Sequence, residues 1–111
     1  MKHLTVESKD LLIGDEAADV LTEYAALVAR EGTGDRVELH AISGDGDDVL
    51  VTVVLSAGTT LLTETAHNSM PEPDNAKALA YMREKIGQAT SPPTVQPEPD
   101  LGAYETQFDE L

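Results

Sequence analysis

The chain has 111 residues, no cysteine and a formal net charge of −14, from 21 acidic and 7 basic residues. This length suits one domain, and the lack of cysteine excludes disulfides, thiolate metal ligands and a cysteine nucleophile. So acidic a balance disfavours direct binding of nucleic acid or of an anionic membrane, because both would be repelled.

Membrane and export signals are not evident. No apolar run approaches the roughly 18 residues of a membrane span, and the opening sequence MKHLTVESKD has no apolar core of signal-peptide length. We therefore expect a cytoplasmic protein. Three tyrosines and one phenylalanine leave little capacity for base stacking.

The first third of the chain predicts one helix after a short strand. Residues 3–8 (HLTVES) alternate weakly, which predicts a short leading edge strand. From Asp15 to Arg30, apolar residues recur at three- and four-residue spacing, the pattern of an amphipathic helix. Asp15 is the predicted N-cap and Gly32 the predicted end of this helix.

Strands dominate the middle of the chain. Residues 36–43 (RVELHAIS) and 49–56 (VLVTVVLS) predict two strands joined by the hairpin loop GDGDD at 44–48. The second is apolar on both faces, which predicts a central strand with Val53 among the most buried residues. A shorter strand is predicted at 60–65.

A proline-containing connection, a second helix and a tail complete the chain. The helix is predicted from Asp74, its cap, to Ile86, with Gly87 as its stop. Beyond it, Pro, Thr, Gln and acids predominate, a composition that buries too little apolar surface to offset the entropy of ordering. We therefore predict a folded domain at 1–88 and a disordered acidic, Pro-containing tail at 89–111.

The element order predicts an α+β domain of helix, three strands and helix, with a short leading strand. A three-stranded antiparallel meander packed under two helices satisfies this order. The order is similar to that of double-stranded RNA-binding domains. That resemblance concerns topology alone, because the basic cluster expected at the start of the last helix is replaced here by residues 71–74 (PEPD).

Metal sites are not predicted, and no cofactor is expected. The loop GDGDD fails the calcium-loop pattern, because the fifth and twelfth positions counted from Asp45 are Val49 and Ser56. The three histidines lack the close spacing of a zinc site; they are His3, His40 and His67.

The segment Glu64–Asp74 holds the ingredients of acid–base or nucleophilic chemistry. Glu64, His67 and Ser69 lie close together in the sequence, but no spacing makes a nucleophile, a base and an orienting group converge. An enzyme that uses this loop is therefore the least favoured hypothesis.

The tail carries the predicted partner-binding residues. Tyr104, Phe108 and Leu111 stand at i, i+4 and i+7, flanked by Asp109 and Glu110. Folded on a partner, they would form a narrow apolar stripe suited to a groove with a basic rim. The alternative is an inert, solubilising terminus.

These observations favour a small acidic, non-enzymatic protein-binding or regulatory module. The expected partner is a protein with a basic surface, without direct nucleic-acid or membrane binding. The alternative is an inhibitor that mimics nucleic acid and occupies a basic nucleic-acid-binding site, which requires acids arrayed in rows on one surface. The sequence does not set the oligomeric state.

Overall fold

A hairpin of two short strands opens the chain. In the computed structural model, which describes residues 1–90, β1 (Lys2–Val6) and β2 (Lys9–Ile13) pair antiparallel through a turn at Glu7 and Ser8. Glu7 has a φ of 56°, a conformation that turns usually assign to Gly, Asn or Asp. The predicted leading strand is confirmed as β1, but the prediction that it is an edge strand is wrong, because β1 pairs with β2 on one side and with β5 on the other. Strand β2 was missed because the turn carries no such residue.

Helix α1 (Asp15–Glu31) confirms the first predicted helix. It ends as expected at Gly32, whose φ of 68° is left-handed and whose N–H bonds back to the last turn. The predicted N-cap is wrong by one residue: Gly14 is the cap, and Asp15 is the first helical residue. Its carboxylate still lies at the positive end of the helix dipole.

The central hairpin also confirms the prediction. Strands β3 (Asp35–Ile42) and β4 (Asp48–Leu55) pair antiparallel along their whole length. The loop closes through the N–H of Ser43, which donates to the Asp47 carbonyl at 2.9 Å. Gly46 supplies the positive φ, 88°, that a short loop of this kind needs.

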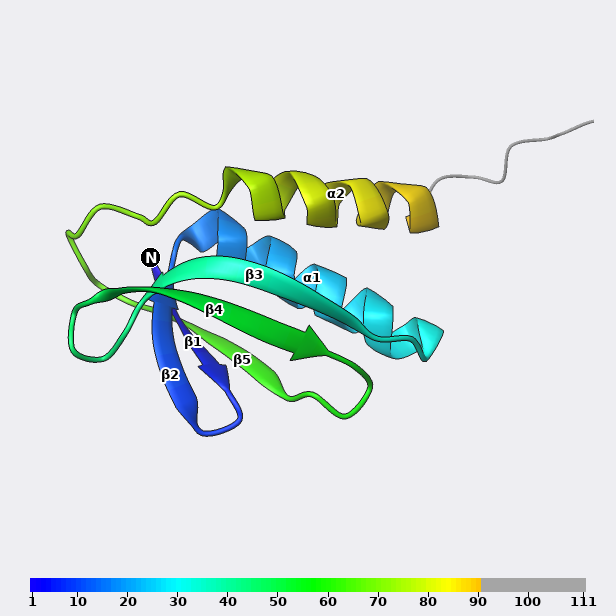
Figure 1. The fold of residues 1–111 in the computed structure, drawn as a ribbon, viewed down its shortest axis with the longest axis horizontal. Helices are drawn as coiled ribbons and strands as arrows, with labels where there is room; N and C mark the ends of the chain where they lie inside the picture. Colours follow the sequence, from blue (N-terminus) through cyan, green and yellow to red (C-terminus); the bar gives the residue numbers. More distant parts are fainter. Residues whose placement is uncertain (91–111) are drawn as a thin grey trace, which may run out of the picture.

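The sheet order overturns the predicted three-stranded meander. Strand β5 (Leu61–Thr65) pairs with β1 and not with β4, which gives the order β4-β3-β2-β1-β5. Consecutive strands β4 and β5 therefore lie at opposite edges, and the sheet curls so that residues 56–60 can join them (Figure 1). The leading hairpin and this crossing also end the topological resemblance to double-stranded RNA-binding domains.

Strand β4 is an edge strand, so the prediction of a central strand is wrong. Its side chains alternate: Val53 is 5% exposed, as predicted, whereas Leu50 and Val54 are 59% and 63% exposed. The apolar residues on its second face are not covered by the rest of the described chain.

The core lies between α1 and the inner face of the curled sheet. Strands β2 and β3 pair only at Leu12 and Ile42 and then diverge, and α1 fills the space between the two hairpins. The largest fully buried side chains come from both hairpins and both helices; they are Leu4, Ile13, Leu21, Leu39, Leu55 and Met82.

Asn75 covers the edge of β3 that β2 leaves open. Its side-chain oxygen accepts the N–H of His40 at 2.7 Å, and its amide donates to the His40 carbonyl at 2.9 Å. Asn75 thus pairs with β3 as a neighbouring strand would, and its own carbonyl accepts the N–H of Leu79 in the first helical turn.

Helix α2 (Ala76–Thr90) starts close to its predicted cap and ends later than predicted. Asp74 accepts the Ala76 N–H at 3.0 Å, although Asn75 is the residue that opens the helix. Gly87 does not stop the helix, which continues to Thr90. The tail predicted from residue 89 therefore lies, beyond Thr90, outside the described residues.

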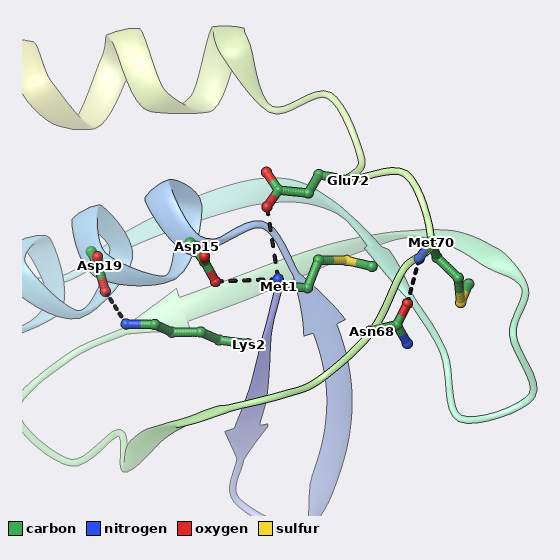
Figure 2. Close-up of polar contacts among 7 residues, drawn as sticks. All are labelled: Met1, Lys2, Asp15, Asp19, Asn68, Met70 and Glu72. Atoms are coloured by element: carbon green, nitrogen blue, oxygen red, sulfur yellow. Dashed lines mark hydrogen bonds and ion pairs between the residues drawn. The ribbon is translucent and has the colours of Figure 1, made fainter.

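Ion pairs hold the connection between β5 and α2 against the start of α1 (Figure 2). The terminal ammonium of Met1 lies 3.3 Å from Asp15 and 3.7 Å from Glu72, and Lys2 donates to Asp19 at 2.6 Å. Further along the connection, Asn68 accepts the N–H of Met70 at 2.6 Å. The ammonium of Met1 thus joins the connection, at Glu72, to the start of α1, at Asp15.

Adjacent residues of β4 provide a matched test of its two faces. Val53→Asp would bury an unpaired carboxylate and should abolish cooperative unfolding in so small a domain. Val54→Asp should stay folded, because that side chain is exposed. Thermal unfolding followed by circular dichroism distinguishes them; a cooperatively folded Val53→Asp variant would contradict the assigned inner face.

Asn75 is buried, 6% exposed, and its side chain should contribute to stability through its two hydrogen bonds to His40. Asn75→Ala leaves the N–H and C=O of His40 without their partners and should cost about 1–3 kcal/mol of unfolding free energy. Asn68→Ala, in the same connection but exposed, should change it by less than about 0.5 kcal/mol. Urea titration measures both, and equal effects would contradict the role given to Asn75.

Candidate functional site

A cleft of about 460 Å³ opens where the C-terminal parts of both helices meet the start of β3. The two helices run in the same direction and lie side by side (Figure 1). The short turn between Gly32, the C-cap of α1, and Asp35, the first residue of β3, forms one wall of the cleft. Its polar and aromatic lining includes Tyr24, Glu31, Asp35, Tyr81, Lys85 and Gln88.

One carboxylate joins three elements in this cleft. Oδ2 of Asp35 accepts hydrogen bonds from the hydroxyls of Tyr24 on α1 and Tyr81 on α2, the latter at 2.6 Å. Oδ1 accepts the backbone N–H of Arg36 at 2.8 Å. The two tyrosine rings meet edge to face, with centroids 6.2 Å apart. Asp35 therefore fixes α2 to α1 at the start of β3.

The hydrogen bonds keep Asp35 ionised. Partial burial alone would raise its pKa, but the bonds from Tyr24, Tyr81 and the Arg36 N–H, together with the charge of Lys85, outweigh burial and lower it. Burial, and then the bond to Asp35, raises the pKa of Tyr24; the bond to Asp35 is the main cause that raises the pKa of Tyr81. Both tyrosines are thus held as neutral donors.

A cation already occupies the outer part of the cleft. The ammonium of Lys85 lies 5.6 Å from the centroid of the Tyr81 ring, which is 39% exposed. Glu31 adds an exposed carboxylate at the end of α1. The carbonyl ends of both helices add partial negative charge on the same side of the domain. The cleft therefore suits a positively charged group.

None of the predicted functional residues that the structure describes lines this cleft. Tyr104, Phe108, Leu111, Asp109 and Glu110 lie outside the described residues. Glu64 lies in β5, while His67 and Ser69 lie in the connection that follows; none of the three shares a hydrogen bond with another. Among residues 1–90, no group of three or more His, Asp or Glu is placed to hold a metal ion.

Sequence reasoning missed the cleft because its members come from three separate elements. Tyr24 fits the apolar stripe of α1, and its position in that stripe does not identify the partner of its hydroxyl. Asp35 and Tyr81 follow no motif. The one available signal is that two of the few aromatic residues of the chain carry hydroxyls on different helices, and such groups need partners when they are buried.

Comparison of the chain with known proteins gives no functional evidence, so its function is inferred from the cleft. No protein-family model matches the sequence, and neither the curated proteins nor the solved structures yield a match. Neither of the two described helices has the length and hydropathy needed to cross a membrane.

The contribution of Asp35 to the stability of the fold should be lost at acidic pH. Its pKa is lower in the folded chain than its ordinary value of 3.8, so the stability it adds is present above that pH and is lost as pH falls through the folded pKa. Asp35→Asn should lose about 1 kcal/mol near neutral pH and show a shallower loss of stability below pH ~4. Thermal unfolding across this range measures the effect.

Asp45→Asn is the control for that experiment. Asp45 is exposed in the β3–β4 loop, so its substitution removes the same charge without removing a hydrogen bond to tyrosine. An acid profile of Asp35→Asn that coincides with the profile of Asp45→Asn would rule out the stabilising role of the Asp35 network.

Proposed function

We propose that this chain is a small acidic, non-enzymatic protein-interaction module whose cleft receives a basic side chain of a partner protein. The observation that carries the proposal is the position of Lys85. Its ammonium lies 5.6 Å from the centroid of the Tyr81 ring, and its charge contributes to the lowered pKa of Asp35, so the cleft already accommodates a cation from its own chain. A partner's cation would take the same place while Lys85 swings into solvent.

Arginine fits this cleft better than lysine does. A guanidinium is planar, stacks on an aromatic face and donates several hydrogen bonds at fixed angles. Tyr81 offers the exposed ring, Glu31 offers a free carboxylate, and Oδ1 of Asp35 keeps a lone pair beyond its bond to Arg36. The net charge of −14 would speed encounter with a basic surface.

The tail is proposed as a second contact with the same partner. Gln88 and Ala89 line the cleft, and Thr90 is the last residue of α2, so the tail begins close to the proposed cation site. The apolar stripe Tyr104, Phe108 and Leu111, with Asp109 and Glu110, would then add specificity that charge alone does not provide.

Nucleic-acid mimicry is less well supported. The acids on the exposed side of α1 begin a row, but two of them are engaged by cations: Glu16 pairs with Arg83, and Asp19 pairs with Lys2. A mimic needs such charges free to face a basic site. An enzyme that uses Glu64–Asp74 has no supporting contact among its candidate groups.

Removal of the resident cation should strengthen binding to an arginine probe. With an amidated, acetylated tetra-arginine peptide as ligand, Lys85→Met should lower Kd roughly two- to fivefold, because an exposed cation–π contact contributes about 0.5–1 kcal/mol. Glu31→Gln should raise Kd more than Glu23→Gln, which removes the same charge from the exposed side of α1. Isothermal titration calorimetry at fixed ionic strength gives the Kd values.

The same series shows when the proposal fails. If Glu31→Gln and Glu23→Gln weaken binding equally, and Lys85→Met does nothing beyond the change in net charge, the peptide binds diffusely and the cleft is not its site. A tetra-lysine peptide provides the second comparison, since it should bind more weakly than tetra-arginine at equal charge.

A further inference from the structure

Strand β4 presents an open edge in the longest stretch of the chain without charge. No residue from 49 to 63 is acidic or basic, in a molecule of net charge −14. On one side β4 pairs with β3 along its whole length; no strand among residues 1–90 pairs with its other side. Native edge strands are usually protected by charge, proline or a bulge, and β4 has none of these between Asp48 and Leu55.

The register shows which backbone groups are free. In an antiparallel pair, hydrogen-bonded and non-bonded positions alternate. Two observations fix that alternation. The N–H of Ser43 donates to Asp47, so this facing pair is a bonded one, whereas the backbone groups of His40 bond to Asn75 and therefore point away from β4. In β4, the N–H and C=O groups of Leu50, Thr52 and Val54 therefore point away from β3.

These free groups have almost no partner within the described chain. The Val54 carbonyl accepts the hydroxyl of Thr59 at 2.9 Å, which leaves its second lone pair available. Leu50 and Thr52 have no partner for their outward backbone groups among residues 1–90. On the outer face, the side chains of Leu50 and Val54 are exposed on either side of Thr52.

We propose that the β4 edge pairs antiparallel with the β4 edge of a second copy of this chain. The two-fold axis passes at Thr52, so Thr52 faces Thr52 of the second copy. Leu50 then faces Val54 of the second copy, and Val54 faces its Leu50. Every free backbone group of Leu50 and Thr52 gains a partner, and both exposed apolar side chains gain an apolar neighbour.

The charge distribution favours a second copy over an unrelated strand. Two molecules of net charge −14 repel each other, and the repulsion is weakest where the contacting surfaces carry no charge, as at residues 49–55 of β4. In the proposed register, Asp48 faces Ser56 of the second copy and not another acid. A basic partner, in contrast, would be drawn to the acidic surfaces and away from this edge.

A single introduced cysteine tests the register, because the chain has no cysteine of its own. Facing residues in a hydrogen-bonded antiparallel pair have Cα atoms about 5.5 Å apart, within the range that a disulfide spans. Full-length Thr52→Cys should therefore form a disulfide-linked dimer under mild oxidation, measured by non-reducing electrophoresis. Thr65→Cys is the control: it is equally exposed, and it lies on β5 at the opposite edge of the sheet.

Sedimentation velocity of the unmodified chain completes the test. The chain should sediment as a dimer, with a dimer fraction that rises with salt as charge repulsion is screened. Val54→Asp, which should remain folded, should sediment as a monomer. The proposal is overturned if the unmodified chain is monomeric at all salt concentrations, if Val54→Asp leaves a dimer intact, or if Thr65→Cys crosslinks as fast as Thr52→Cys. Salt should have the opposite effect on the cleft, where it should weaken binding of the arginine peptide. Dimer formation and peptide binding can therefore be measured, and can fail, separately.

Discussion

The single paired position between β2 and β3, Leu12 with Ile42, is the constraint on which the rest of the structure depends. Because β2 and β3 pair at this position alone, the two hairpins are joined loosely within one curled sheet, and the apolar face of α1 packs against its inner face. This single pairing also leaves outward backbone groups of β3 without a partner in β2. Buried backbone groups need partners, and the side chain of Asn75 provides them for His40.

The cleft is a consequence of that arrangement. Asn75 fixes the start of α2 beside β3, and from there α2 runs along α1 in the same direction (Figure 1). Both helices then end on one side of the domain, near the first residue of β3. Asp35 meets a tyrosine from each helix there, and the carbonyl ends of the helices add to its negative charge. The negative charge of the cleft thus comes from the topology as well as from the side chain of Asp35.

Local patterns in the sequence predicted the elements well and their pairing poorly. Helix α1, strands β3 and β4 and the loop between them follow from short-range periodicity and from Gly and Asp in the turn. The first turn was missed because Glu7 adopts a positive φ without being Gly or Asn. The partner of β5 depends on curvature of the whole sheet, which no local pattern records. The cleft joins Tyr24, Asp35 and Tyr81 across three elements, so its geometry exists only in the folded chain.

The wrong prediction for β4 bears on the proposed pairing of two copies of the chain. Apolar residues on both faces of β4 predicted burial within one chain, yet its outer face is exposed. Pairing between two copies would close the open edge of β4 and place Leu50 beside Val54 of the second copy. Because Asp35 faces Leu55 in the β3–β4 register, the cleft lies near the end of β4, only a few residues from the proposed axis at Thr52. A dimer would hold two cation-binding clefts close together and related by two-fold symmetry. A partner with repeated basic side chains would then bind both at once, and the second contact would be intramolecular, which raises the overall affinity of a site that is weak alone.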